Sequence, residues 1–380
     1  VKKYDKILIH FFDPAYFQLL EPQDLSNTQI ILYSHGTDAL YRAFDVIGRP
    51  YFVSDYVVPE SFTKTFALRD YYIKKYNNLP NVKFVFVSNW AKKMSEELLK
   101  IKYNNAEVIP CFIDEKQFPY TEKDPELRKR VFVLRKFDDL STYSIDIDVR
   151  VILELSHRKC FNDMEFSIYG DGGIHDKLVE PLRKFSNVHI YRKFLSHDEI
   201  KMMQKENGIG LFATRFDTQA VSSCEAAMAG CVVVSSKNVG TCEYIDPKIG
   251  TFCETENIIE YADLIEELYN DPKLFKTMSE KMHDSVMKTC SYKYSIKKDM
   301  DMILSFDKTE KIKVPDIKKN PILSIVIPSY NVGKYIKGGV KSLLRSKYAS
   351  DLEIIIVNDG SKDDTCLLYT SPSPRDVEES

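Results

Sequence analysis

The stretch that most constrains the fold runs from residue 208 to residue 236 and reads GIGLFATRFDTQAVSSCEAAMAGCVVVSS. An apolar run ends at Phe212, and a polar loop begins at Thr214. A helix of small residues is predicted from near Ser223 to Gly230, and β-branched residues follow at 232–234. This order of strand, loop, helix and strand is typical of a βαβ unit in a parallel sheet.

Two carboxylates mark this stretch as a candidate ligand site. Asp217 lies in the predicted loop outside the carboxyl end of a strand, and Glu225 lies in the first turn of the predicted helix. Open α/β sheets bind ligands in the crevice at that edge.

Length and composition limit the class of protein. A chain of 380 residues is too long for one ordinary core, so we expect two or three domains. Its net charge of -3 gives no electrostatic case for a nucleic-acid partner. Eight cysteines without a CxxC pair predict reduced thiols rather than a metal or disulfide framework. With no apolar run of membrane-spanning length and no signal peptide, we expect a cytoplasmic protein, with the inner membrane surface as an alternative location.

The first 120 residues predict a Rossmann-like half. Short apolar runs, followed in several cases by helical patterns, fall at 5–11, 28–33 and 82–87, with a fourth ending at Pro110. Ser88 is the predicted N-cap of the helix after the third run. Because the chain opens at Val1 almost directly with a strand, we expect its start to be missing.

A polar turn, SHGTD, follows the second of these strands. His35 can donate or accept a proton there, and Asp38 can orient it or cap the next element of the chain. The alternative is that His35 is an ordinary loop residue and Asp38 a helix cap.

Residues 121–306 predict a second doubly wound domain. A charged, proline-containing segment at 119–130 separates it from the first, and we interpret that segment as the interdomain linker. The pattern gives strands at 131–134, 165–169 and 187–195, helices at 149–158, 197–207 and 259–271, and further helical patterning to 305.

Residues 307–320 are charged and aperiodic, which is typical of a linker. Residues 321–365 read as strand, loop, helix and strand, which cannot close a core by themselves. We therefore expect them to be the truncated start of a third domain. Residues 366–380 continue neither element and are expected to be a non-native tail.

Arg135 and Lys136 follow the strand at 131–134, at the predicted ligand edge. Guanidinium groups bind phosphate oxygens through charge-assisted hydrogen bonds, so the pair suits a diphosphate. The alternative is a solvated pair on a loop. The turn Gly170–Gly173 allows close approach of a backbone to a ligand, although turns of this composition usually only reverse the chain.

Glu225 has two interpretations. Ser222 and Glu225 have the spacing of a capping box, in which the glutamate bonds back to the start of its own helix. Alternatively, Glu225 accepts hydrogen bonds from two ribose hydroxyls while the loop amides from Gln219 to Ser222 and the helix N-terminus bind phosphate.

The succession VFVLRKF, SIYGDGG and DTQAVSSCEAAMAGCVVVSSKNVGTCEYI resembles the nucleotide-sugar domain of family 4 glycosyltransferases, which have two facing Rossmann domains, the GT-B fold. The resemblance extends over about residues 1–305 and implies that Glu225 holds the donor ribose, Asp217 the transferred sugar and Arg135 the diphosphate. Three features depart from the family: Asp217 replaces a glutamate, Ala220 replaces a glycine, and the second lysine after Arg135 is missing.

PILSIVIPSYN and LEIIIVNDGSKDDT resemble the opening of a family 2 glycosyltransferase of the GT-A fold. Pro328, Tyr330, Asn331 and Asp359 fall on positions that contact the nucleotide in that family. Its metal ligands and catalytic base lie downstream, so this segment is expected to be inactive.

These resemblances imply an α/β protein that transfers a sugar from a nucleotide diphosphate to a glycan or lipid-linked hydroxyl with retention, in surface polysaccharide synthesis. No cofactor is expected for the GT-B unit, a divalent metal only for an intact GT-A domain, and peripheral membrane association is a further expectation. The expected catalytic residues are Asp217, Arg135 and His35. The expected donor-binding residues are Arg135, Lys136, Gly170, Asp171, Gln219, Val221, Ser222 and Glu225. A nucleotide-sugar epimerase and a non-catalytic sugar-nucleotide or glycan-binding module are the alternatives.

Overall fold

The computed structural model describes residues 5–22, 28–36, 38–40, 60–138, 142–237, 240–305, 323–329 and 352–358, with a few single positions. The chain divides into two compact units. The first is Leu8–Phe12 with Ile30–Asp307, and the second is Val1–Ile7, Asp13–Gln29 and Lys308–Ser380. Every residue of the candidate site belongs to the first unit.

A four-stranded sheet with the order β1-β2-β3-β4 forms from the first part of the chain. Its elements are β1 (Lys6–His10), α1 (Pro14–Leu20), β2 (Gln29–Ser34), α3 (Glu60–Asn77), β3 (Val82–Phe86), α4 (Asn89–Leu99) and β4 (Ala106–Val108). Strands β2, β3 and β4 are parallel. The apolar run in β2 is buried throughout, as a strand covered on both faces requires. Ser88 accepts a hydrogen bond from the Ala91 amide, which confirms it as the N-cap of α4.

A six-stranded sheet with the order β10-β9-β8-β5-β6-β7 forms from the second part. Its strands are β5 (Arg130–Leu134), β6 (Glu165–Gly170), β7 (Val188–Arg192), β8 (Ile209–Phe212), β9 (Val232–Ser236) and β10 (Phe252–Cys253). All of the pairings are parallel. Numbered from β5, this is the order 3-2-1-4-5-6 of a dinucleotide-binding sheet. The predicted class, α/β with two parallel sheets, is confirmed.

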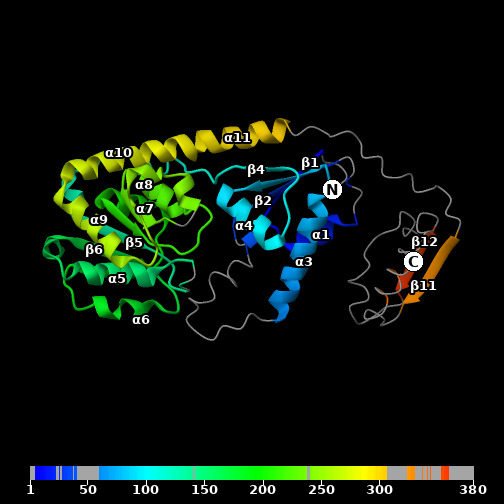
Figure 1. Ribbon diagram of the computed structural model, residues 1–380, viewed down its shortest axis with the longest axis horizontal. Coiled ribbons are helices and arrows are strands. Elements are labelled where there is room, and N and C mark those ends of the chain that lie inside the picture. Colours follow the sequence, from blue (N-terminus) through cyan, green and yellow to red (C-terminus); the bar gives the residue numbers. More distant parts are fainter. Residues whose placement is uncertain are drawn as a thin grey trace. The chain divides into compact units, whose positions relative to one another are not determined.

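Helices cover this sheet and complete its core. They are α5 (Ile145–Leu155), α6 (His175–Val179), α7 (His197–Glu206), α8 (Val221–Met228), α9 (Ile258–Asn270), α10 (Pro272–Thr289) and α11 (Tyr292–Ser305). The connecting 3-10 turns are η3 (Pro125–Lys129), η4 (Lys159–Asp163), η5 (Glu180–Leu182), η6 (Gly240–Glu243) and η7 (Pro247–Ile249). Helix α5 packs on α9, and α8 packs on α10. Helices α10 and α11 follow each other nearly end to end (Figure 1), and Asp299 of α11 accepts a 2.7 Å hydrogen bond from Tyr33 of β2.

Helix α8 begins earlier than the sequence predicts. Ala220 is its N-cap in a left-handed conformation, with φ 56° and ψ 62°, and no side chain caps the helix. Glu225 is therefore the fifth helical residue, and its predicted place in the first turn is wrong. The capping-box interpretation of Ser222 and Glu225 is also wrong. It requires Ser222 to be the N-cap, but Ser222 is the second residue of the helix.

In the second unit, β11 (Leu323–Ser329) and β12 (Leu352–Asn358) form a parallel pair in which Pro328 lies opposite Val357. This agrees with the two strands that the sequence predicts there. Tyr330, Asn331 and Asp359, the other predicted nucleotide contacts, lie outside the described residues.

Candidate active site

The strand order places a topological switch point between β5 and β8. Strand β5 pairs with β6 on one side and with β8 on the other, so the connections that follow β5 and β8 lead away from each other. Arg135 directly follows β5, and residues 213–220 follow β8. Open α/β sheets bind ligands in the crevice that this divergence leaves.

A cavity of about 350 Å³ lies at the loop after β8. Both halves of the first unit contribute to its lining, which consists of His35, Val87, Cys111, Tyr143, Asp217, Thr218, Gln219, Val221, Ser222 and Glu225. The structure thus brings together six side chains that the sequence singles out: His35, Asp217, Gln219, Val221, Ser222 and Glu225. We call this space the donor cavity.

A buried ion cluster holds the loop after β8 in place. The guanidinium of Arg215 forms two 2.8 Å contacts with the carboxylate of Asp146 on α5, and its Nε lies 2.7 Å from Glu256. The Arg215 side chain is only 5% exposed. Because such a planar, bidentate pair fixes both position and orientation, the loop is held rigidly against α5.

Asp217 shapes the end of this loop. Its Oδ1 accepts hydrogen bonds from the amides of Gln219, at 3.2 Å, and Ala220, at 3.0 Å. This local turn brings Ala220 into its left-handed conformation, which costs about 1–2 kcal/mol for a residue with a side chain. Asp217 therefore has a structural task on one oxygen, and its Oδ2 can face a ligand.

Glu225 projects from α8 into the donor cavity. Burial raises the pKa of its carboxyl group to about 7. Within the described part of the chain the carboxyl makes no hydrogen bond or ion pair. Glu225 is partly buried, and a carboxylate shielded from water without an internal partner is costly, so the site is suited to a ligand that brings hydroxyl donors.

Arg135 is a buried cation with weak internal partners. It is 5% exposed, and its Nη1 and Nη2 reach Ser222 Oγ and the Ala213 carbonyl only at 3.4 Å. Its Nε is buried and has no partner within the described residues. The guanidinium carbon lies 4.8 Å from the ring centre of Phe212 and 5.4 Å from that of Tyr143. Two aromatic rings and an unused donor position this group to bind an anion.

Asp148 is a buried carboxyl group near Arg135. It is fully buried on α5, and its Oδ1 accepts a 2.9 Å hydrogen bond from the Ala213 amide. Burial raises the pKa of Asp148 to about 8, although the nearby Arg135 opposes the shift. Asp148 was not predicted from the sequence. The feature that could have indicated it is an aspartate within the apolar pattern of a helix.

Lys136 and the glycine turn lie apart from the donor cavity. Lys136 Nζ contacts Asp138 Oδ2 at 2.5 Å, and Asp171 Oδ1 accepts from Arg192 Nε at 2.8 Å. A Cβ on Gly170 would lie 1.8 Å from the Arg135 carbonyl oxygen. The missing side chain of Gly170 therefore makes room for the backbone of Arg135. Lys136, Gly170 and Asp171 do not line the cavity.

His35 brings an imidazole from the other half of the first unit. Its Nε2 lies 2.9 Å from His10 Nδ1, and its Nδ1 lies 3.8 Å from Cys111 Sγ. Burial lowers the pKa of His35, which favours the neutral ring. A neutral imidazole can accept a proton, which is what a general base beside an acceptor hydroxyl does.

Asp38 holds the turn that presents His35. Its Oδ1 accepts from the His35 and Gly36 amides at 3.1 and 2.8 Å, and its Oδ2 accepts from the Phe12 amide at 3.0 Å. Asp38 thus positions the backbone of His35 rather than its imidazole.

Gln219 ties the donor loop to the first half. Its side-chain amide donates to the Cys111 carbonyl and accepts from the Cys111 amide, both at 2.7 Å. Nearby, Tyr244 Oη donates to the Val87 carbonyl, and Glu243 accepts from the amides of Asn89 and Trp90. These contacts join residues 219 and 243–244 to the first half of the unit. Sequence reasoning placed Gln219 at the donor, and the structure uses its side chain for this contact.

Four lining residues were not anticipated: Val87, Cys111, Tyr143 and Thr218. Cys111 directly follows the predicted strand that ends at Pro110, and Val87 ends another predicted strand, so strand ends were the available signal. Nothing in the pattern around Tyr143 indicates that it reaches the cavity.

Among the described residues, no three His, Cys, Asp or Glu side chains gather in the manner of a metal site. In the same residues, no helix is both long enough and apolar enough to cross a membrane.

Two family models match the chain. Residues 149–284 match the model of glycosyl transferases group 1, and residues 324–367 match that of glycosyl transferase family 2. The first match includes β8, the loop after it and Glu225, whereas β5 and Arg135 precede it.

Relatives in sequence match short segments. The chondroitin synthase of Escherichia coli is 47% identical over 60 residues, which are 16% of this chain and 9% of that protein. The uncharacterized glycosyltransferase EpsJ of Bacillus subtilis is 51% identical over 43 residues, 11% of this chain and 12% of that protein. The chain therefore matches only about a tenth of the length of these relatives.

Solved structures share the fold over most of the chain. A sucrose-phosphate synthase of Thermosynechococcus elongatus superposes with a TM-score of 0.60 at 14% identity, covering 80% of this chain and 73% of that one. A mutant of TarM from S. aureus, solved with fondaparinux, α-GlcNAc-glycerol and UDP, gives a TM-score of 0.56 at 18% identity. The match covers 78% of this chain and 55% of that one. The two parallel sheets are thus those of the GT-B fold.

Proposed function

We propose that the protein is a retaining glycosyltransferase, because residues 149–284 match the model of glycosyl transferases group 1. It takes a sugar from a nucleotide diphosphate and transfers it to a hydroxyl of a glycan or lipid-linked acceptor. The observation that carries the proposal is the convergence of Glu225 and Arg135 on the β5/β8 switch point. Glu225 is a partly buried acceptor, and Arg135 is a buried cation; neither the Glu225 carboxyl nor the Arg135 Nε has a partner within the described residues.

In this proposal the nucleotide lies along the start of α8. The carboxylate of Glu225 accepts hydrogen bonds from the two ribose hydroxyls, and the first amides of α8 face the diphosphate. Arg135 binds a diphosphate oxygen and stabilises the negative charge that develops as the bond to the sugar breaks. The lysine expected after Arg135 is missing, and Lys136 pairs with Asp138, so Arg135 supplies most of this stabilisation.

The transferred sugar and the acceptor meet between Asp217 and His35, which line the same cavity. Asp217 contacts sugar hydroxyls through Oδ2 while its Oδ1 holds the loop. His35, whose pKa burial lowers, receives the acceptor from the first half. The similarity to a chondroitin synthase supports a polysaccharide as the destination of the sugar.

Nucleotide release from a panel of sugar nucleotides tests the proposal. With UDP-glucose, GDP-mannose and related donors, and glycan or lipid-linked acceptors, we expect acceptor-dependent release of the nucleoside diphosphate. The anomeric configuration of the product, measured by NMR, is expected to match that of the donor. A Glu225→Ala variant is expected to lose both donor binding and release.

Other outcomes would replace the proposal. Interconversion of the donor sugar without an acceptor would indicate an epimerase. Donor binding without release to any acceptor or to water would indicate a sugar-nucleotide-binding module. Normal donor binding by Glu225→Ala would contradict the assignment of the cavity itself.

A further inference from the structure

A second concave region is lined in part by Glu243 and Tyr244. One cavity of about 620 Å³ lies between the segment 242–249 and the last turns of α10. Another of about 370 Å³ lies between the start of α4, β4 and α11. Both are lined by Glu243 and Thr289, so the two cavities adjoin, and we refer to them together as a groove. None of the residues of this groove lines the donor cavity.

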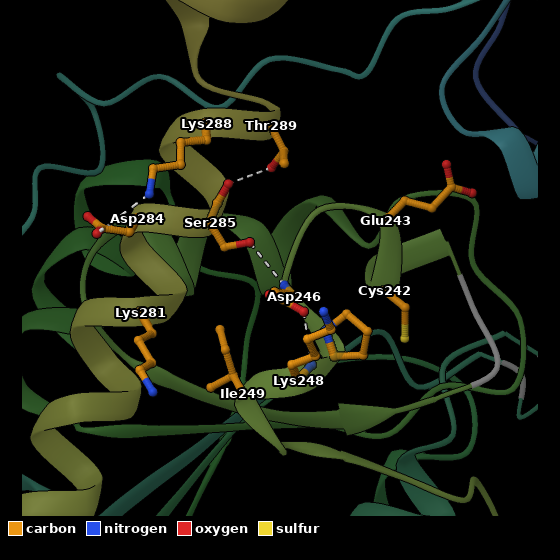
Figure 2. A pocket seen from close by; sticks show the side chains of 11 residues that line it. Cys242, Glu243, Asp246, Lys248, Ile249, Lys281, Asp284, Ser285, Lys288 and Thr289 are labelled. Carbon is orange, nitrogen blue, oxygen red and sulfur yellow. Dashed lines mark hydrogen bonds and ion pairs between the residues drawn. The ribbon is translucent and has the colours of Figure 1, made fainter.

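Five lysines line this groove, which we call the lysine groove. They are Lys92, Lys248, Lys281, Lys288 and Lys298. Figure 2 shows Lys281 and Lys288 on α10 and Lys248 on the facing segment. Lys248 and Lys281 are exposed. Within the described part of the chain, Lys248, Lys281 and Lys298 form no ion pair, so these three cations are available to a ligand.

The carboxylates of the groove are already engaged by the protein. Glu243 accepts from the Asn89 amide, the Asn89 side chain and the Trp90 amide at 2.7–2.9 Å, at the N-terminus of α4. Asp246 accepts from the Lys248 amide, and Glu107 pairs with Lys83 at 2.6 Å.

The fourth carboxylate, Asp284, is only loosely paired. It lies 3.9 Å from Lys288, a contact drawn in Figure 2. These contacts fix the carboxylates in place without removing their charge, so five lysines face four carboxylates and the lining keeps a small positive excess.

An aromatic ring adds a second element of recognition. Tyr294 of α11 lines the smaller cavity and is 41% exposed, beside Lys298. An exposed tyrosine offers an apolar ring face with a polar edge, which suits the faces and hydroxyls of a sugar. Lysines spaced along a concave surface, with an aromatic ring at one end, fit a chain of sugars that carries anionic groups.

We propose that the lysine groove binds an anionic oligosaccharide chain, with its carboxylates or other acidic substituents on Lys248, Lys281 and Lys298 and a sugar ring on Tyr294. A nucleic acid is disfavoured by the overall charge of -3. A membrane surface is disfavoured because the cations lie inside a concavity rather than on a protruding face. The groove is one contact from the donor cavity, since Tyr244, which lines the groove, donates a hydrogen bond to the carbonyl of Val87, which lines the cavity.

Direct binding measurements test this site without any transfer reaction. The full chain is titrated with a hyaluronan decasaccharide, which carries a carboxylate on alternate sugars, and with uncharged maltodecaose of equal length. We expect the hyaluronan decasaccharide to bind and maltodecaose not to bind, and the affinity to fall as salt is raised from about 50 to 500 mM. The Lys248→Glu/Lys281→Glu variant is expected to bind roughly tenfold more weakly or worse.

A matched control separates the groove from general charge. Lys201→Glu/Lys273→Glu makes the same change in net charge at two exposed lysines that line neither cavity, and it is expected to bind like the wild type. Lys298→Glu tests the Tyr294 end separately. Thermal unfolding of each variant confirms that the exposed substitutions leave the fold intact.

Several results would overturn the assignment. These are equal binding of maltodecaose, an equal loss in the control variant, or no binding of the hyaluronan decasaccharide by the wild type. Binding to phosphatidylglycerol vesicles that is lost in Lys248→Glu/Lys281→Glu, without oligosaccharide binding, would assign the groove to a membrane surface instead. UDP-glucose or GDP-mannose affinity is expected to be unchanged in the groove variants, so failure here is distinguishable from failure of the proposed donor site.

Discussion

The donor cavity and the lysine groove use charge in opposite ways. In the donor cavity the charged groups are few and partly buried, and burial raises the pKa of Glu225 to about 7. In the groove the cations are numerous and mostly exposed to water. A buried charge interacts strongly with a ligand because little solvent screens it, whereas exposed charges contribute little individually and act together. Single substitutions should therefore disable the cavity, and only combined ones the groove.

Arg135→Ala is expected to give the largest effect. It removes a buried guanidinium whose Nε has no partner within the described residues, and a charge-assisted hydrogen bond contributes about 1.5–3 kcal/mol. We expect affinity for UDP-glucose or GDP-mannose, whichever the wild type binds, to fall about 100-fold by calorimetry. Arg135→Lys keeps the charge but loses the planar fork, and should give an intermediate loss. Unchanged affinity in Arg135→Ala would remove the diphosphate from this position.

Glu225→Gln is expected to weaken donor binding about tenfold or more, because an amide accepts only one of two ribose hydrogen bonds well. The loss should depend on pH. Binding of hydroxyl donors needs the carboxylate, so wild-type affinity is expected to rise between pH 6 and 8 as Glu225 ionises. Sugar nucleotides carry no phosphate group that ionises in this range. A flat profile in the wild type, or a parallel rise in Glu225→Gln, would contradict the role of this group.

Glu225 is expected to affect the folding stability of the unliganded protein in the opposite direction: stability falls as pH rises, whereas donor affinity rises. The folded-state pKa of Glu225, about 7, lies above its ordinary value of 4.5. The folded state therefore binds the proton more tightly, and this contribution is complete below pH 4.5 and lost as pH rises through about 7. We expect Glu225→Gln to be more stable than the wild type at pH 8, by on the order of 2 kcal/mol, and similar to it at pH 4.5. Urea denaturation at the two pH values measures this.

Ala220→Gly is expected to stabilise the protein by roughly 0.5–1 kcal/mol. Glycine adopts the φ of 56° without strain, and this gain exceeds the larger entropy that glycine loses on folding. Ala226→Gly is the matched control: the same change inside α8, at a fully buried site, should destabilise by about 1 kcal/mol. Urea denaturation compares the two. Equal destabilisation in both would show that Ala220 stores no strain beside the donor cavity.

Lys281→Gln alone is expected to give the smallest effect, less than about threefold in affinity for the hyaluronan decasaccharide, since one exposed cation contributes about 0.2–1 kcal/mol. The loss is measured in the same titration as that of Lys248→Glu/Lys281→Glu. A tenfold loss from this single change would mean that the groove relies on one dominant contact, and would remove the contrast with the donor cavity.

Local patterns in the sequence predict a large part of the site. The βαβ stretch placed Asp217 and Glu225 correctly on a loop and a helix, and the strand before Arg135 placed that residue at the carboxyl edge of the sheet. These predictions succeed because hydrophobic period and strand ends are encoded within a few residues. Their roles in donor binding stay predictions until a ligand is bound.

The sequence does not reveal features that depend on distant partners. The bond between Gln219 and the Cys111 backbone joins residues 108 apart. Likewise, Lys136 fits a diphosphate on sequence grounds, yet Asp138 engages it. The capping-box prediction failed because Asp217 holds the amides of Gln219 and Ala220 and so starts α8 earlier. Competition among several possible acceptors is decided by three-dimensional geometry, which spacing alone does not specify.

A crystal structure with UDP-glucose or GDP-mannose bound would show whether the donor cavity holds the nucleotide as proposed. We predict both ribose hydroxyls within hydrogen-bonding distance of the Glu225 carboxylate and a diphosphate oxygen at the guanidinium of Arg135. A nucleotide bound elsewhere, or one in this cavity whose ribose does not touch Glu225, would contradict the proposed donor site.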